Sequence, residues 1–411
     1  MIGQELKNRR KKVFDYMKDN SSAIIFSGEL FKSENGNDYE FEVNRDFYYL
    51  TGVDEEDCIL LLYKCGNEER EMLFIPKNNE FASKWTGIKL SIPEVMALSE
   101  AEEVFYLDEF EKYINEIGNS EDMKNIYCTL DENNQSENYN LNLRMFKEMY
   151  KVFDNLEFYN IKKCIDSLRE VKTKYEVRCL YEGAKNLKNA VNMAMKITRE
   201  GVKEGEIAAT IDYVSRKEGC TIPFPTIVAG GKNALTLHYI KGKDRVKDGE
   251  LVLLDCGSGV DKYSADVSRT YPVSGKFSDL QKKIYSIVLK ANKSVIENAR
   301  PGVTLTELNE IVIDIYEKEL SEMGLIEKRE EVNNYYYHFV SHHIGLNCHD
   351  PFEKDKPLRA GNVITVEPGL YIDKFGIGIR IEDNVLITED SNIVLTKGIM
   401  KEIDEIEAFM S

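Results

Sequence analysis

The stretch Leu251-Val-Leu-Leu-Asp-Cys-Gly257, followed by Ser264-Ala-Asp-Val-Ser-Arg-Thr-Tyr271, predicts a β-hairpin that carries two acids. The first segment is apolar enough for a buried strand, and the glycine-containing residues 257–263 supply the turn. A turn centred near residues 260 and 261 would set Asp255 directly opposite Asp266, with Cβ atoms roughly 5 Å apart. Two carboxylates held so close together beside an apolar run need a shared proton or a cation.

The same pattern recurs further along the chain. Segments 362–369 and 377–384 read Asn-Val-Ile-Thr-Val-Glu-Pro-Gly and Ile-Gly-Ile-Arg-Ile-Glu-Asp-Asn. A turn centred near residues 374 and 375 places Glu367 opposite Glu382, and Arg380 then points to the same side as Glu382. A strand-end acid is often only a turn or capping residue, but that explanation would have to hold for four acids in two matched hairpins. The carboxylates therefore predict an oxygen-rich site for a hard or borderline cation such as Mn(II).

Histidines are confined to the C-terminal half of the chain, at positions 238, 338, 342, 343 and 349. If the stretch 335–350 were helical, His338 and His342 would share a face and resemble a zinc pair. The tyrosines before His338 and the glycine at position 345 argue against a long helix there. His343 follows His342 directly and is expected to point away from it, in a structural role.

The first part of the chain predicts an α/β module, because short apolar runs alternate with polar helical stretches. The expected strands are 23–26, 46–50, 58–63 and 71–75, and the expected helices are 6–17 and 108–117. The polar tract 131–140 predicts a surface loop. A boundary within 165–174 divides the chain into an N-terminal domain, 1–165, and a larger domain, 166–411.

Three helices are expected in the second domain. Apolar residues repeat at helical spacing from Val177 to Met195, and Gly201 is the expected C-terminal cap. A second helix runs from about Ser278 to Ala299. The third opens at Thr304 with a capping-box pattern. With the strands between them, these helices predict a mixed α/β (α+β) fold.

Composition excludes several classes of protein. The chain has 411 residues, 42% of them hydrophobic, which is enough for a packed core. The 54 basic against 72 acidic residues give a formal charge of −18, which argues against nucleic-acid binding. No apolar run approaches the ~18 residues of a membrane span, and no signal core follows the basic N-terminus, so a cytoplasmic address is expected.

Eight scattered cysteines without a C-x-x-C pair predict reduced, mostly buried thiols. Cys256 and Cys348 flank candidate site residues, but alternation along the strand turns Cys256 away from Asp255, and neither is expected to be a nucleophile. Trp85 is the single tryptophan of the chain. On residue type alone it is either a core or partly buried aromatic or part of a functional surface.

Five segments, taken in order, are similar to the pita-bread metallopeptidases, most closely to the aminopeptidase P and prolidase branch. They are 253–257, 266–270, 341–350, 365–371 and 378–383, and Arg45-Asp-Phe-Tyr-Tyr-Leu-Thr-Gly52 resembles part of the N-terminal domain of the same enzymes. The resemblance implies a C-terminal pita-bread catalytic domain preceded by a smaller α/β domain.

The resemblance also implies the residues of the site. The implied metal ligands are Asp255, Asp266, His342, Glu367 and Glu382, with Asp266 and Glu382 bridging two divalent ions, most often manganese, although cobalt or zinc can substitute. Positions that match substrate-binding and proton-handling residues are His238, His338, His349, Glu367 and Arg380. Tyr371 would join Arg380 behind the metals.

The implied activity is release of the N-terminal residue from peptides with proline in the second position. A hydroxide bridging the two metals would attack the scissile carbonyl. A prolidase that cleaves only Xaa-Pro dipeptides shares every ligand and stays open as an alternative, as does a non-catalytic pita-bread binding module. A metal-free creatinase-like hydrolase would not need all these carboxylates, and the N-terminal module disfavours a methionine aminopeptidase. Relatives form homodimers or homotetramers, which makes Trp85 a candidate to line a neighbour's site.

Overall fold

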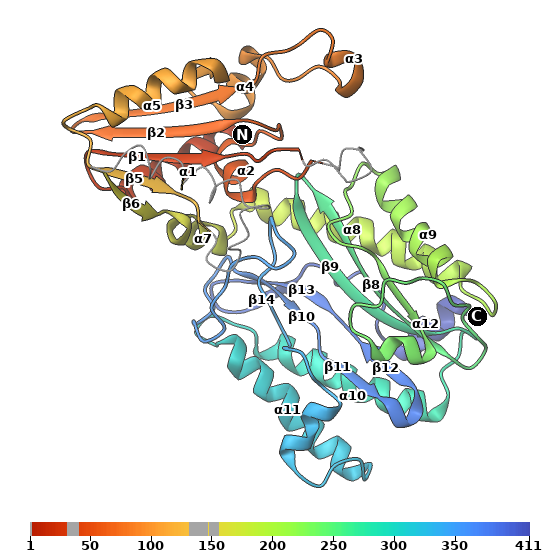
Figure 1. The fold of residues 1–411 in the computed structure, drawn as a ribbon. Helices are drawn as coiled ribbons and strands as arrows, with labels where there is room; N and C mark the ends of the chain where they lie inside the picture. Colours follow the sequence, from red (N-terminus) through yellow and green to blue (C-terminus); the bar gives the residue numbers. More distant parts are fainter. Residues whose placement is uncertain (1, 31–40, 131–146, 148–155) are drawn as a thin grey trace. The chain divides into compact units, whose positions relative to one another are not determined.

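The computed structural model describes residues 2–30, 41–130, 147 and 156–411 (Figure 1). The chain forms two compact units, Met1–Leu168 and Arg169–Ser411. Helix α7 (Lys162–Glu170) spans this division. The loop predicted at 131–140 lies outside the described residues.

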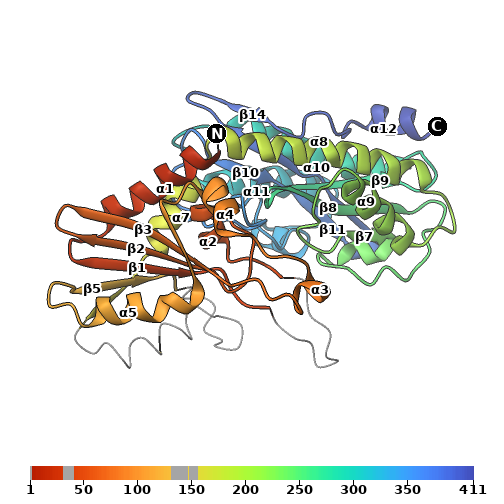
Figure 2. The ribbon, with the colours of Figure 1, turned by 90° about the horizontal axis from the view of Figure 1, so that it is seen from above.

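The first unit is built on a six-stranded sheet with the order β4-β3-β2-β1-β5-β6. Its central strands β1 (Ser21–Phe26), β2 (Ile59–Cys65) and β3 (Glu68–Ile75) are antiparallel, and β4 (Glu103–Tyr106), β5 (Asn125–Cys128) and β6 (Glu157–Asn160) add in parallel. Helices α1 (Ile2–Tyr16) and α5 (Phe110–Gly118) cover opposite faces of this sheet (Figure 2). The expected α/β module is therefore confirmed.

One expected strand of this unit is wrong. Residues 46–50 belong to helix α2 (Arg45–Thr51), not to a strand. The side chain of Asn44 accepts hydrogen bonds from the N–H groups of Asp46 and Phe47, and Gly52 ends the helix at φ +69°. These two helix ends outweigh the strand preference of the aromatic residues between them, because each satisfies backbone groups that a short helix otherwise leaves unpaired. The short helices α3 (Ser83–Thr86) and α4 (Ile92–Ser99) belong to the same unit.

The second unit combines three small sheets with five helices, as far as the described residues show. Strands β7 (Ile227–Gly230), β8 (Leu251–Val260) and β9 (Tyr263–Pro272) form one antiparallel sheet. Strands β10 (Val363–Val366), β13 (Asp383–Ile387) and β14 (Asn392–Val394) form a second sheet, and β11 (Gly369–Ile372) pairs with β12 (Ile377–Arg380). The helices are α8 (Lys174–Ile197), α9 (Glu204–Lys217), α10 (Asp279–Asn298), α11 (Leu305–Glu322) and α12 (Ile403–Met410).

A long helix fixes the position of the acid-bearing hairpin. Helix α8 packs along β8 and β9, and it approaches so closely that a Cβ at Gly183 would stand 2.7 Å from the Ser258 carbonyl oxygen. The helix ends at Ile197 with Thr198 as its C-cap, so the cap expected at Gly201 is three residues too late. The start of α10 expected near Ser278 and the capping box predicted at Thr304 for α11 are confirmed.

The turn of the first hairpin is centred one residue later than expected, so the two strands pair in a different register. Asp255 pairs with Ser268, and Asp266 pairs with Gly257. The turn is centred on Asp261 and Lys262, whose φ angles of +48° and +66° give the double left-handed conformation that suits the twist of a two-residue hairpin. Asp255 and Asp266 therefore share one face of the ribbon but are diagonal neighbours, not directly opposed.

The second hairpin has the expected register. Val366 pairs with Asp383 and Gly369 with Arg380, so Glu367 and Glu382 lie opposite each other between the two paired segments. None of the described helices is both long enough and apolar enough to cross a membrane.

Candidate metal centre

The two hairpins and one extended segment bring the predicted acids and His342 together. Asp266 on β9, Glu382 between β12 and β13, and His342 each offer a ligand atom, and these three atoms lie within 4.8 Å of one another. The Nε2 atom of His342 is 3.5 Å from Glu367 Oε1 and 4.0 Å from Asp266 Oδ2. Asp255 reaches the group through Arg380, whose Nη2 donates to Asp255 Oδ2 at 2.7 Å.

Unpaired oxygens show that this cluster suits cations. Within the described part of the chain, Asp255 Oδ1, Asp266 Oδ1 and Glu382 Oε1 are buried and have no hydrogen-bond partner. Buried polar atoms are normally paired, so three unpaired carboxylate oxygens in one cluster need an explanation. His342 Nδ1 is 3.0 Å from the His343 carbonyl oxygen, which fixes the tautomer with Nε2 as the free ligand atom. These donors fit divalent metal ions.

Burial makes this cluster of acids costly without a cation. It raises the pKa of Asp266 and of Glu382, and the charges of the neighbouring carboxylates raise both further. Burial also raises the pKa of Glu367, which settles at about 7 because Arg380 opposes the shift. Divalent cations would replace the protons that these groups otherwise hold.

Arg380 links the acids to an aromatic group behind them. Its Nε donates to Ser268 Oγ at 2.7 Å, and that hydroxyl donates to Glu382 Oε2 at 2.8 Å. Its Nη1 donates to the Tyr371 hydroxyl at 3.0 Å, and the same hydroxyl lies 2.9 Å from His338 Nε2. Arg380 therefore points to the side of Glu382, as predicted, and Tyr371 contacts it.

The predicted histidines occupy three different settings. His338 and His342 do not lie on a helix, which agrees with the sequence argument against one. Burial lowers the pKa of His338 to about 3. His349 stacks on His342 with ring centres 4.1 Å apart, and partial burial of its ring lowers its pKa to about 4. His238 is exposed, and after burial its charge is a further cause that lowers the pKa of His338 and His349.

The predictions about His343 and about the cysteines are confirmed. His343 turns away from the acids and stacks on Phe352 with ring centres 5.8 Å apart. Cys256 is fully buried in the core, with Sγ 3.7 Å from the Val267 carbonyl oxygen. All eight cysteines are free thiols.

Sequence reasoning missed several supporting residues. Ser268 lies two positions after Asp266 on β9, so strand alternation could have indicated it. Cys348 donates from Sγ to Asp266 Oδ2 at 3.0 Å, a contact across 82 residues without a local signal. Asn384 clamps the backbone of Asp266, accepting from its N–H at 3.0 Å and donating to its carbonyl oxygen at 2.7 Å.

Glu204 is a further missed residue, at the start of α9. Its fully buried carboxylate accepts from Gly230 N, Asn233 Nδ2, Tyr239 Oη and Asp244 N at 2.8–3.2 Å. These bonds hold both ends of the segment 230–244, which carries His238. In a sequence, a Glu in the first turn of a helix indicates only a favourable charge at the helix N-terminus. The sequence therefore gave no sign that Glu204 holds the segment 230–244.

Comparison with known proteins agrees with the fold. Residues 178–389 match the model of metallopeptidase family M24, and residues 6–127 match that of the aminopeptidase P N-terminal domain. A fold with these domains and a buried cluster of carboxylates and histidine defines a metallopeptidase. The chain belongs to metallopeptidase family M24, whose members act with divalent metal ions.

Similar proteins cover nearly the whole chain. A Xaa-Pro aminopeptidase from Haemophilus influenzae is 32% identical over 99% of this chain and 97% of its own length. The structure of Escherichia coli aminopeptidase P with the inhibitor Pro-Leu has a TM-score of 0.91 at 28% identity, covering 99% of this chain and 98% of that one. A zinc-substituted form of the same enzyme in complex with product has the same TM-score, identity and coverage.

Proposed function

We propose that this metallopeptidase is a Xaa-Pro aminopeptidase, which releases the N-terminal residue from peptides with proline in the second position. The observation that carries this proposal is the set of unpaired buried carboxylate oxygens around His342 Nε2. The relatives named Xaa-Pro aminopeptidase support it, because they align with almost all of this chain. A non-catalytic binding module would have no use for so costly a cluster of acids.

In this proposal two divalent cations are held by Asp255, Asp266, His342, Glu367 and Glu382. Asp266 and Glu382 would each hold both ions, in keeping with their burial and their unpaired oxygens. Four carboxylates and one imidazole favour manganese, with cobalt or zinc as substitutes, and the zinc-substituted relative is in line with that range. Such cations supply the Lewis acidity that makes water nucleophilic near neutral pH.

Glu367 is proposed as the group that handles the proton. Its carboxylate would take a proton from water and later return it. The return matters for this substrate class, because the leaving nitrogen of proline must be protonated before it departs. His342 Nε2, 3.5 Å away, would restrict the carboxylate to one orientation during that transfer.

Three imidazoles are proposed to bind the substrate and the developing oxyanion. Their pKa values of about 3 and about 4 keep His338 and His349 neutral at physiological pH, so both would contact the substrate without adding charge. His238 is exposed and free to meet an incoming peptide. Arg380 and Tyr371 position the acids and His338 from behind.

The acidic character of the site supports exopeptidase specificity. The free amino terminus of a peptide is cationic and is attracted to a cluster of carboxylates in a partly dehydrated site. An internal peptide bond offers no such charge. The cluster therefore favours cleavage next to a free N-terminus over cleavage within a chain.

A comparison of substrates tests the activity. Purified protein loaded with manganese should hydrolyse Xaa-Pro-Xaa tripeptides at the first bond, with little turnover when alanine replaces proline. Tripeptides blocked at the N-terminus should resist cleavage. Hydrolysis of Xaa-Pro dipeptides alone would replace the proposal by prolidase, and no hydrolysis of either would leave a binding module.

Assembly and address form a further part of the proposal. Trp85 on α3 has 79% of its surface exposed, which argues against a core role and for a contact between copies of the chain. We propose a homodimer or homotetramer in the cytoplasm, acting on peptides, without nucleic-acid or membrane partners. Light scattering of the wild-type protein and of Trp85→Ser, together with cell fractionation, tests both statements.

A further inference from the structure

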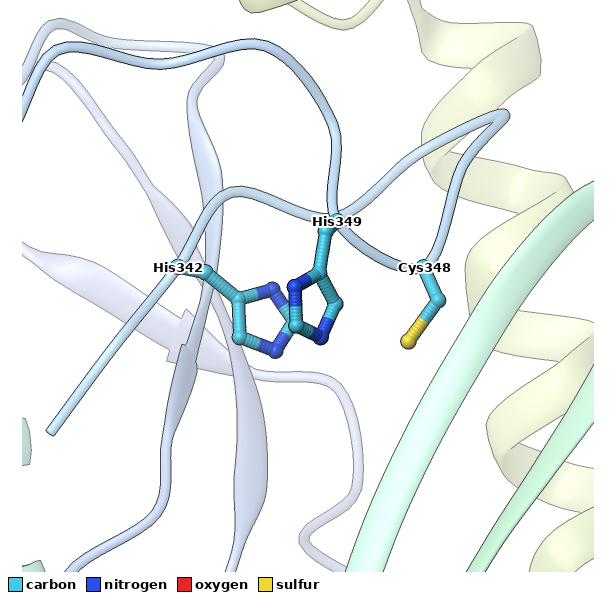
Figure 3. Close-up of side chains that lie close together, drawn as sticks. All are labelled: His342, Cys348 and His349. Atoms are coloured by element: carbon cyan, nitrogen blue, oxygen red, sulfur yellow. The ribbon is translucent and has the colours of Figure 1, made fainter. Parts of the chain in front are cut away.

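Soft donor atoms gather beside the proposed metal centre. One ring nitrogen of His342, Sγ of Cys348 and one ring nitrogen of His349 all lie within 4.8 Å of one another. Figure 3 shows the two imidazoles side by side, with the sulfur of Cys348 next to the ring of His349. The stacking of the rings, at 4.1 Å and 27°, keeps both imidazoles on this side of the segment.

We propose that His342, Cys348 and His349 form an auxiliary site for a thiophilic divalent cation, Zn²⁺ or Cd²⁺, which shares His342 with the proposed metal centre. Thiolate and imidazole are the ligands that zinc prefers, whereas manganese prefers carboxylate oxygens. The chain thus places a soft donor set directly against a hard one. The shared imidazole cannot serve both sites fully at once.

The thiol of Cys348 is placed to bind a soft cation, because its Sγ lies within 4.8 Å of a ring nitrogen of His342 and of His349. When the cation binds, the S–H bond breaks, a sulfur–metal bond forms and the proton passes to solvent. The hydrogen bond from Sγ to Asp266 Oδ2 is lost in the same step.

The exposure of the three residues decreases from the surface inward. His349 is exposed, Cys348 is partly exposed and His342 is buried, so a cation meets the outer imidazole first. His342 Nδ1 stays bonded to the His343 carbonyl oxygen, which leaves Nε2 for the cation. Because that nitrogen is also a proposed ligand of the catalytic ions, binding at the two sites is expected to be mutually unfavourable.

Cadmium absorption provides a test that does not depend on hydrolysis. Titration of the metal-free full-length chain with Cd²⁺ should produce sulfur-to-cadmium charge-transfer absorption in the ultraviolet, equivalent to one thiolate per chain. Added Mn²⁺ should move the titration to higher cadmium concentrations. In Cys348→Ser the absorption should disappear, because the variant has no thiolate at this position to bind cadmium.

Cys65→Ser is the matched control, because Cys65 is the other partly exposed thiol of the chain. It should keep the absorption and the affinity of the wild type. Absorption that persists in Cys348→Ser, or that is absent from the wild type, would overturn the site. Because Cd²⁺ and the catalytic ions compete for His342, Cd²⁺ is also expected to inhibit hydrolysis, and this expectation rests on the proposed function. The cadmium absorption does not rest on it. A protein that shows the absorption but no peptidase activity would therefore refute only the proposed function.

Discussion

Arg380 and Asp255 form an ion pair across 125 residues, with Nη2 2.7 Å from Oδ2. The same guanidinium donates to Ser268 and to Tyr371, so one side chain connects both acid-bearing hairpins. It leaves Asp255 Oδ1 without a partner. Arg380 therefore offsets part of the negative charge of the cluster while keeping a ligand oxygen available.

Arg380→Lys should lower kcat strongly, because an ammonium cannot make the three directed contacts of the guanidinium. We expect at least a tenfold loss, on the order of 1.4 kcal/mol in transition-state stabilisation. Steady-state kinetics with an Xaa-Pro tripeptide measure it. Arg359→Lys is the control, since Arg359 is half exposed and pairs with Glu170 away from these contacts. Equal effects of the two variants would contradict a specific role for Arg380.

Glu382→Gln should abolish metal-dependent turnover and leave the protein folded. An amide cannot supply the negative charge that two cations need, and loss of a bridging ligand should reduce kcat by more than about 100-fold. Metal content by mass spectrometry and the circular dichroism spectrum separate ligand loss from unfolding. Asp266→Asn should behave in the same way. The exposed Asp373→Asn is the control, and full activity in either ligand variant would refute the bridging assignment.

Chelation should remove activity, and Mn²⁺ should restore it and raise the melting temperature. A ligand at a hundredfold excess over its Kd stabilises a folded protein by about 2.7 kcal/mol. Because Glu367 has a pKa raised to about 7, the protein must release a proton to bind metal below that pH. Apparent affinity should therefore increase as the pH rises through 7, which calorimetry in buffers of different ionisation enthalpy can measure. An affinity independent of pH would contradict metal binding by Glu367.

Glu204→Gln should impair catalysis through the segment 230–244. An amide offers one acceptor oxygen in place of two, so the four hydrogen bonds that hold this segment cannot all form. We expect a fall in kcat/KM of roughly tenfold or more from misplacement of His238, with the metal content unchanged. Amide hydrogen exchange should increase within 230–244. Glu206→Gln, on the exposed side of the same helix, should change neither quantity.

Asp350→Asn should destabilise the second unit by about 3 kcal/mol, because it leaves the cations of Arg169 and Lys172 buried without their partner. Burial alone would raise the pKa of Asp350, but these two cations lower it to about 2. A carboxylate with a lowered pKa stabilises the folded state at pH values above the ordinary aspartate pKa of about 3.9. This contribution is lost as the pH falls toward about 2.

Urea unfolding at pH 7 and at successively lower pH tests this pair. The difference in unfolding free energy between wild type and Asp350→Asn should narrow below about pH 4. Asp314→Asn removes an exposed partner of Arg329 and should cost less than about 1 kcal/mol at any pH. A difference that stays constant down to pH 3 would show that the charge of Asp350 is not what stabilises the fold.

The sequence by itself determined the features that depend on local patterns. Alternation along strands placed Glu367, Glu382 and Arg380 on one face, and a capping box located the start of α11. Periodicity and caps act within a few residues, so they can be read without a structure. Local signals gave two wrong predictions. At α2, the residues that cap the helix outweighed the strand preference of the aromatic residues. In the first hairpin, a left-handed turn shifted the register between Asp255 and Asp266.

Only the tertiary structure decided which distant groups touch. The contacts of Cys348 with Asp266, of Glu204 with the segment 230–244, and of Arg380 with Asp255 join residues from 26 to 125 positions apart. Such contacts depend on how the hairpins and helices pack, and no periodicity encodes them. The burial that raises the pKa values of the acids is likewise a property of the packed unit, because it follows from the exclusion of water by the surrounding core.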